Sequence, residues 1–252
     1  MSKLKYFDCN CSIGRLAHPA LYDNINVKGL KEEMATAGVE EALVFHNMAR
    51  DSAPSLGNAK LIEELKDAEE LHPAWVVLPH HTGEIPAPAQ LLKDMEQAGV
   101  KAVRMYPTKD YHSFSLADWC SGELLSALAE ARVPLLLDIE IVWWETIQTL
   151  LEKYPTLPII ATNVSYRHHR FIYPLFERYP QLHVETSRFF AASAFEDIVN
   201  RFGPGPIMFG THMPFLTGTP AVSMLTYADI SREAKEAISG GTLRSLLKEA
   251  LS

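Results

Sequence analysis

The sequence is poor in cysteine and has no long apolar run. Its three cysteines, Cys9, Cys11 and Cys120, are too few for a disulfide framework and fit a reducing cytoplasm. No stretch approaches the ~18 consecutive apolar residues that a membrane span needs. The first residues, MSKLKYFDCNC, contain no apolar region of the kind found in secretory signals. We therefore expect a cytoplasmic protein without a membrane partner.

Positive charge is also scarce, because 23 Lys and Arg residues stand against 31 Asp and Glu residues, giving a net charge of −8. A nucleic-acid-binding surface would be basic, so we expect no nucleic-acid partner. No glycine-rich phosphate loop follows the first apolar run, which disfavours a dinucleotide-binding fold. No linker rich in Gly, Ser or Pro divides the 252 residues, and this length suits a single domain spanning 1–252.

Short apolar runs alternate with longer amphipathic segments along the whole chain. Such alternation predicts parallel strands joined by helices, and eight repeats in a chain of this length predict a (β/α)8 TIM-like barrel. Two glycines that follow predicted helices, Gly38 and Gly99, suit the left-handed conformation that ends a helix. The predicted strands lie near 4–12, 40–46, 74–80, 101–106, 133–139, 158–163, 181–187 and 206–211, and the predicted helices near 28–37, 58–71, 87–98, 121–131, 143–153, 168–178, 194–202 and from 219 onward.

Polar residues stand at the carboxyl ends of several predicted strands. In parallel barrels these ends form the face where chemistry takes place. Alternation along the first strand turns Asp8 into the barrel together with every second residue, and turns Cys9 and Cys11 outward. The polar residues of greatest interest at these ends are Asn10, Ser12, Asp138, Asn163 and His212.

Five segments carry a family resemblance: FDCNCSIG (7–14), PLLLD (134–138), PIIATN (158–163), IMFGTHMPF (207–215) and ISGGTLRSLL (238–247). Together they resemble the amidohydrolase superfamily, in its amidohydrolase-related (amidohydrolase 2) branch. The resemblance implies a β/α-barrel enzyme with four His and one Asp around a metal, at the five strand-end positions named above. This chain departs from that pattern at all five. The resemblance also implies a homo-oligomer, most simply a dimer.

The departures bear directly on metal binding. Asp138 and His212 are competent ligands, whereas the two asparagines and the serine offer only neutral oxygens. We therefore expect either no metal or a weakly bound divalent ion, zinc if any, on Asp138 and His212. A relocated metal site that combines His46, His80 or Glu185 with Asp138 and His212 is a further alternative.

His212 and Asp138 could also act without a metal. An imidazole near its ordinary pKa of ~6.5 is a sound general base for water or a substrate hydroxyl, and Asp138 would orient or stabilise it. An equally open alternative is that the five strand-end residues hydrogen-bond to one another and simply fill an abandoned metal cavity.

Other polar residues at strand ends are candidates for substrate binding. Arg104 lies in an otherwise apolar strand and needs a partner, which is either a substrate carboxylate or an internal salt bridge to Asp138 or Asp8. Trp143 and Trp144 either wall the pocket or serve packing or an oligomer contact. The candidate substrate-binding residues are Asn10, Ser12, His46, His80, Arg104, Tyr106, Asn163 and Arg167.

Two classes of function remain open from the sequence. The first is an amidohydrolase-like hydrolase, or a decarboxylase- or lactonase-type lyase, that acts on a small, anionic, carboxylated molecule with His212 as general base. The second is a catalytically inactive barrel that serves as a ligand-binding or protein-interaction module.

Overall fold

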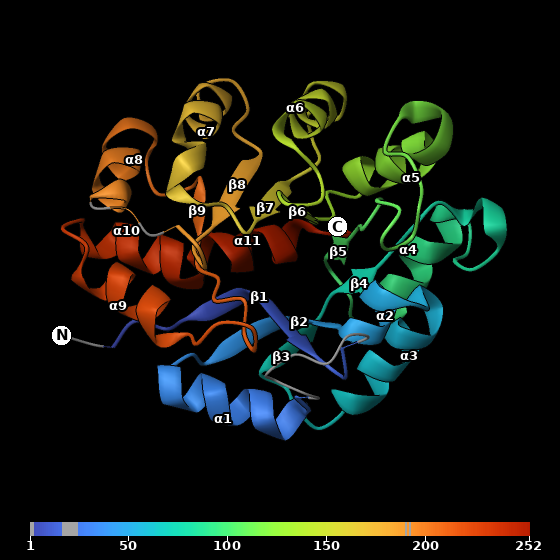
Figure 1. Ribbon diagram of the computed structural model, residues 1–252, viewed down its shortest axis with the longest axis horizontal. Helices are drawn as coiled ribbons and strands as arrows, with labels where there is room; N and C mark the ends of the chain where they lie inside the picture. The colour runs from blue at the N-terminus through green and yellow to red at the C-terminus, as the bar shows by residue number, and fades with distance from the viewer. Residues whose placement is uncertain (1–2, 17–24, 190, 192) are drawn as a thin grey trace.

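A computed structural model gives the fold of residues 3–16, 25–189, 191 and 193–252. Within these ranges all neighbouring strands pair in parallel, and helices lead from one strand to the next (Figure 1). The strands are β1 (Phe7–Ile13), β2 (Glu41–His46), β3 (Leu71–Pro73), β4 (Trp75–Val76), β5 (Val103–Arg104), β6 (Leu135–Asp138), β7 (Ile159–Thr162), β8 (Leu182–Glu185) and β9 (Ile207–Met208). The α-helices are α1 (Val27–Ala37), α2 (Asn47–Asp51), α3 (Pro54–Glu64), α4 (Pro88–Gln97), α5 (Asp118–Glu130), α6 (Trp144–Lys153), α7 (His169–Phe176), α8 (Ala194–Phe202), α9 (Thr219–Tyr227), α10 (Arg232–Glu236) and α11 (Thr242–Glu249).

Three shorter helical turns complete the described elements. Two are 3₁₀ turns, η1 (His80–Thr82) and η2 (Tyr166–His168), and the third is a π-type turn, η3 (Ala237–Gly241). No helix among the described residues is both long and apolar enough to cross a membrane.

The strands form a (β/α)8 barrel, as the sequence predicts. They pair in two groups, β1 to β3 and β4 to β9. The groups are continuous at Ala74, because its N–H donates to Val44 O (2.8 Å) while the N–H of Trp75 donates to Ala102 O (3.1 Å). The third strand therefore runs over 71–76, earlier than the 74–80 predicted from sequence. At the opposite edge, the N–H of Cys9 donates to Phe209 O (3.0 Å), which brings β1 beside β9.

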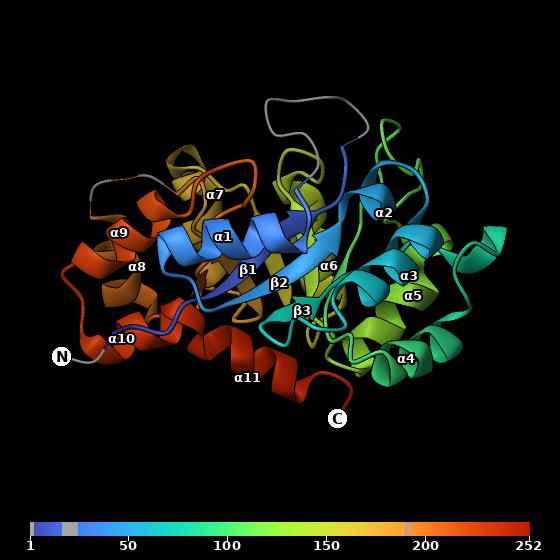
Figure 2. The same ribbon diagram turned by 90° about the horizontal axis from the view of Figure 1, so that it is seen from below.

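A compact cluster of apolar side chains fills the inside of the barrel. It takes Leu136 from β6, Ile160 from β7 and Met208 from β9, and their neighbours along each strand point outward toward the helices. Helix α11 lies below the strands in Figure 2 and adds Leu243 and Leu247 to the cluster. The amino-terminal end of the barrel is therefore closed by packed side chains, and the opposite end is left for polar groups.

The prediction that Cys9 points outward was wrong. Cys9 belongs to the inner cluster, while Cys11 packs in the outer layer as predicted. The cause is local, because the register of β1 against β2 shifts between Asp8 and Cys11 and breaks the strict alternation of faces. Both thiols are fully buried, and burial is the largest cause that raises the pKa of each.

Gly38 ends α1 as its sequence position predicts. It has φ 79°, and its N–H donates to the carbonyls of Ala35 and Met34. Only glycine adopts this left-handed conformation without steric cost. The chain can therefore turn sharply into β2, whose carboxyl end supplies part of the candidate site.

Candidate functional site

The structure brings four of the predicted strand-end residues into two hydrogen-bonded pairs. The guanidinium of Arg104, at the end of β5, donates to Asn10 Oδ1 over 2.5 Å. The side-chain amide of Asn163, directly after β7, donates to Asp138 Oδ2 at the end of β6. The first contact joins β5 to β1 and the second joins the neighbouring strands β6 and β7. We call these four residues, with Ser12 and His212, the polar chamber.

Two residues of the polar chamber have unusual backbone conformations. Asn163 has φ 60° and His212 has φ 61°, in the left-handed region that most side chains avoid. Asparagine and histidine are among the residues that tolerate it best. Such conformations cost free energy and concentrate at functional sites, so they support the choice of these positions.

Arg104 is a buried charge without a charged partner. Its side chain donates to Tyr106 Oη (3.0 Å) and to Asn10, and its guanidinium lies 4.3 Å from the ring centre of Phe45. The residue is 5% exposed. Within the described ranges no carboxylate lies at ion-pair distance from it.

The alternative of an internal salt bridge is therefore wrong. Asp8 instead accepts hydrogen bonds from the N–H and the hydroxyl of Thr211. Asp138 accepts from Asn163 and from the backbone N–H of Glu140 (2.9 Å). Because burying an unpaired charge is costly, Arg104 is poised to take up an anion.

Four buried polar atoms around the chamber lack a hydrogen-bond partner among the described residues: Asn10 Nδ2, Ser12 Oγ, Asn163 Oδ1 and His212 Nδ1. They include both donors and acceptors. The alternative of a fully satisfied polar network is therefore wrong, and the chamber is suited to a ligand that both accepts and donates hydrogen bonds.

His212 does not have the ordinary pKa expected from the sequence. Burial, the largest cause, and the charges of Arg104, Arg188 and Arg50 together lower its pKa to about 3. Its ring packs against that of Phe215, with ring centres 4.8 Å apart. The imidazole is therefore neutral at physiological pH, and its role as general base stays a prediction.

Sequence reasoning missed Arg50. This residue lies on α2, directly after β2, and its guanidinium sits 5.9 Å from the ring centre of Phe45 and 5.5 Å from that of Phe215. Its Nε and Nη2 groups donate to the Asp51 carboxylate over 2.6 Å and 3.2 Å, which fixes the orientation of the guanidinium. The signal in the sequence was an arginine four residues beyond the end of a barrel strand, in a segment too short to predict as a helix.

Glu185 lies in the predicted seventh strand and Arg188 directly follows that strand. Both side chains have clear structural partners. Arg188 donates to Glu140 over 2.7 Å. Glu185 is fully buried and accepts from the N–H groups of Asn163 and Ser187, each over 2.7 Å. Burial is the largest cause that raises the pKa of Glu185. Its contacts hold the Asn163 backbone in place.

Other predicted substrate-binding residues make contacts that serve local structure. His46 Nδ1 accepts from the N–H of Met48 (3.0 Å) and so caps α2. His80 lies 3.8 Å from Glu123, and its ring packs at a tilt against that of His81. Arg167 is exposed and contacts its neighbour, Tyr166. Their roles in substrate binding stay predictions.

The two tryptophans after β6 do not close the polar chamber. Trp144 is buried in the core and Trp143 is 47% exposed. Trp143 packs edge-on against His168 and Phe171, with ring centres 5.6 Å and 5.5 Å apart. These contacts fit the packing interpretation of this pair.

The residues in the chamber do not fit a divalent metal. Asn10 Oδ1 already accepts from the positive Arg104, so a cation beside this oxygen would meet charge repulsion. Asn163 and Asp138 are hydrogen-bonded to each other, so the Asp138 carboxylate already has a partner. Among the described residues, no three His, Cys, Asp or Glu side chains are grouped to hold a metal ion, which includes the relocated set. We therefore derive no chemical step through a metal.

Comparison with known proteins identifies the family. The family described as Amidohydrolase (Amidohydro_2) matches residues 17–248. The match covers most of the sequence, so this chain belongs to the amidohydrolase 2 family. A comparison with curated protein sequences found no match.

Solved structures with the same fold cover both chains almost completely. A TIM-barrel protein of uncharacterised function from Bordetella bronchiseptica has a TM-score of 0.74 and 17% identity, over 98% of this chain and 99% of that one. The 2,6-dihydroxybenzoate decarboxylase from Rhizobium has a TM-score of 0.70 and 16% identity, over 98% and 99%. The 5-carboxyvanillate decarboxylase from Novosphingobium aromaticivorans, solved with manganese and a nitrobenzoic acid, has a TM-score of 0.74 and 11% identity, over 97% and 96%. At these identities the likeness shows the fold alone.

Proposed function

We propose that this barrel is an enzyme that acts on a small organic molecule bearing a carboxylate, and that Arg104 binds the carboxylate. The observation that carries the proposal is the burial of Arg104 with only neutral oxygen partners, Asn10 and Tyr106. A carboxylate would pair with the guanidinium and accept from the free Nδ2 of Asn10. The named structural neighbours that act on aromatic carboxylates agree with this substrate class.

The charges around the chamber favour an anion further. Arg50, Arg104 and Arg188 all act on His212, which places three guanidinium groups around one imidazole. Arg50 and Arg188 are each paired with a carboxylate, so Arg104 supplies the unbalanced charge. A bound carboxylate would offset that charge and so oppose the part of the His212 pKa shift that the arginines cause, while burial, the largest cause, would still lower the pKa.

Within this proposal, His212 is the proton acceptor beside the bound substrate. Asp138 supports the site through Asn163, whose side-chain oxygen stays free to contact substrate. The reaction is hydrolysis of a C–O or C–N bond, in which His212 accepts a proton from water, or cleavage of a C–C bond with loss of CO₂, in which a proton from solvent replaces the carboxyl group on carbon. The two classes differ in whether water is consumed, and product analysis distinguishes them.

The test is binding of 2,6-dihydroxybenzoate by calorimetry to the wild type, Arg104→Met, Arg104→Lys and the control Arg201→Met. Losing a buried charge pair costs about 2 kcal/mol or more, so we expect Arg104→Met to raise Kd by about 30-fold. Arg201 pairs with Asp197 on the surface, and its replacement should leave Kd unchanged. An unchanged Kd in Arg104→Met would refute the proposal. An equal rise in Kd in Arg104→Met and in the control Arg201→Met would also refute it.

A second candidate function is a barrel that binds a carboxylate without transforming it. The observation that favours it is the pKa of His212, about 3, because so weak a base activates water poorly. Incubation of the wild type with aromatic carboxylates and carboxylated lactones, followed by product analysis, separates the two. Binding without any product supports the second candidate.

A further inference from the structure

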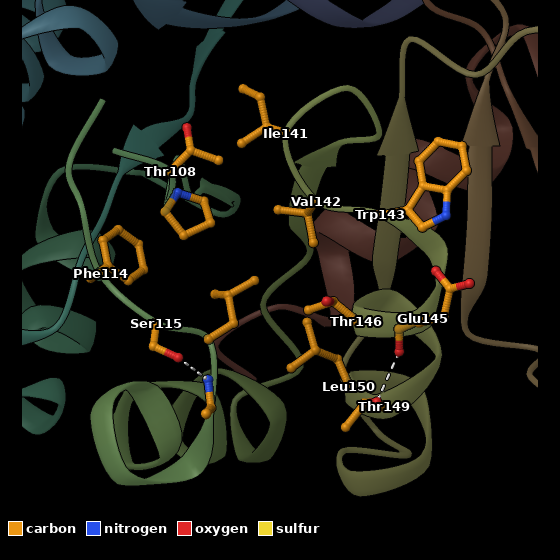
Figure 3. Close-up of a pocket in the computed structure, with 13 residues that line it drawn as sticks. Thr108, Phe114, Ser115, Ile141, Val142, Trp143, Glu145, Thr146, Thr149 and Leu150 are labelled. Carbon is orange, nitrogen blue, oxygen red and sulfur yellow. Dashed lines mark hydrogen bonds between the residues drawn. The ribbon is translucent and has the colours of Figure 1, made fainter. Parts of the chain in front are cut away.

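A second cavity, of about 650 Å³, lies outside the polar chamber between the start of α5 and the face of α6. Figure 3 shows Phe114 and Ser115 on one side of it, and Val142, Thr146 and Leu150 on the other. Its size falls within the range of about 300–1,000 Å³ that is typical of small-molecule sites.

The cavity wall suits an uncharged ligand. Most of its lining is apolar, and the apolar residues include Phe114, Val142 and Leu150. Among the described residues that line it, Glu145 is the only charged one. A carboxylate at the rim and no arginine or lysine disfavour an anion, which separates this cavity from the chamber around Arg104.

Apart from Glu145, the hydrogen-bonding groups in the cavity are few and neutral. Thr108 and Thr146 add hydroxyls, while the hydroxyl of Thr149 is already bonded to the carbonyl of Glu145. The helices α5 and α6 both start here, and among the described residues neither has a side-chain cap. First-turn N–H groups and the threonine hydroxyls can therefore meet one oxygen of a ligand.

An aromatic ring is the shape that this wall accommodates best. Phe114 lines the cavity with its ring, and Trp143, whose ring packs against His168 and Phe171, borders it. Aromatic side chains bind flat apolar rings through large contact areas at small entropic cost. A fused bicyclic ring with one hydroxyl matches the volume, the apolar wall and the sparse polar groups.

The cavity shares structure with the polar chamber. Ile141 lines the cavity and also packs against the buried group formed by Phe45, Val76 and Tyr106. The N–H groups of Ile141 and Val142 donate to Asp138 O over 2.9 Å and 2.7 Å. One short loop thus forms a wall of the cavity and follows directly from a chamber residue.

We propose that the cavity between α5 and α6 is a binding site for an uncharged aromatic molecule with a hydroxyl group, distinct from the carboxylate site at Arg104. The two sites differ in charge and are joined by the loop that carries Ile141. This proposal does not depend on the reaction assigned to the chamber.

The test compares two probes with the same ring system, 2-naphthol and 2-naphthoate, by calorimetry and ligand-observed NMR. Thr146→Phe would fill the cavity from an exposed helix position. Its matched control is Thr36→Phe on the exposed face of α1, far along the chain from the cavity. Arg104→Met removes the proposed carboxylate anchor.

We expect Thr146→Phe to raise the Kd of 2-naphthol by tenfold or more (about 1.4 kcal/mol). The same variant should leave the Kd of 2-naphthoate within twofold. Arg104→Met should instead raise the Kd of 2-naphthoate and leave that of 2-naphthol within twofold. Thr36→Phe should change neither.

Three results would overturn the cavity proposal: no measurable 2-naphthol binding by the wild type, equal weakening by Thr36→Phe, or weakening by Arg104→Met instead of Thr146→Phe. If Arg104→Met fails to raise the Kd of 2-naphthoate while the 2-naphthol results are as expected, the carboxylate site is contradicted and the cavity site remains supported.

Discussion

His212 shows how a residue can be placed correctly from sequence while its chemistry depends on distant partners. The motif around it located the residue at the barrel mouth, but the three arginines that lower its pKa come from α2, β5 and the segment after β8. Their approach is a property of the closed barrel, which no local pattern encodes. The expectation of an ordinary pKa failed because burial, the largest cause, and these three charges all lower the pKa of His212.

Replacement of His212 tests its role without confusing chemistry with backbone strain. Because φ is 61° here, His212→Asn keeps a residue that tolerates this conformation, whereas alanine adds about 1–2 kcal/mol of strain. We expect both variants to lose at least 100-fold in kcat, as is typical for loss of an acid–base group. The Tm should fall only in His212→Ala, and turnover near the wild-type rate in His212→Asn would rule out its role.

Metal content is a second prediction at the scale of single residues. Since Asn10 is bonded to Arg104, and Asn163 to Asp138, we expect protein purified without chelator to carry far less than one equivalent of zinc, manganese or iron. Elemental analysis measures this directly. One equivalent per chain, lost together with activity in Asp138→Ala, would overturn the assessment that these side chains do not fit a metal.

Among the secondary-structure elements, β8 contains a buried histidine that links stability to pH. His183 lies inside the barrel wall and its Nδ1–H donates to Gly205 O over 2.8 Å. Burial is the largest cause that lowers its pKa to about 4. The unfolded chain, with a pKa near ~6.5, therefore binds a proton more readily than the folded one.

Stability should consequently fall as the pH drops from about 6.5 to 4, and the His183 contribution to that fall is about 3 kcal/mol. We expect His183→Gln, which keeps a donor for Gly205, to lose less stability than the wild type over this interval in urea titrations. The exposed His81→Gln serves as control and should behave as the wild type does. Identical curves for all three proteins would contradict this assignment.

The elements also show what the sequence could and could not predict. Apolar periodicity and Gly38 were enough to place most strands and helices, because both are local signals. The break in alternation at Cys9 was not predictable, since it arises from the register of β1 against β2. Arg50 escaped notice because α2 has five residues and no periodic pattern.

For the whole molecule, family membership leads us to expect a homodimer. Several large side chains on the described surface are strongly exposed, including Trp119 at 80% and Tyr227 at 86%, and exposed aromatic residues are common at interfaces. Light scattering after size exclusion should give about twice the 28.2 kDa chain mass. A mass of one chain at micromolar concentration would contradict the expectation.

The backbone hydrogen bond between Cys9 and Phe209 has a consequence for how the protein folds during synthesis. It joins residues about 200 positions apart, and the inner core is completed only by Leu243 and Leu247 of α11. During synthesis, β1 leaves the ribosome long before either partner exists, so one flank of this strand and the apolar interior stay open while most of the chain emerges. The nascent chain should therefore depend on chaperones until its last helix is released, and ribosome-bound chains halted before α11 should remain sensitive to protease.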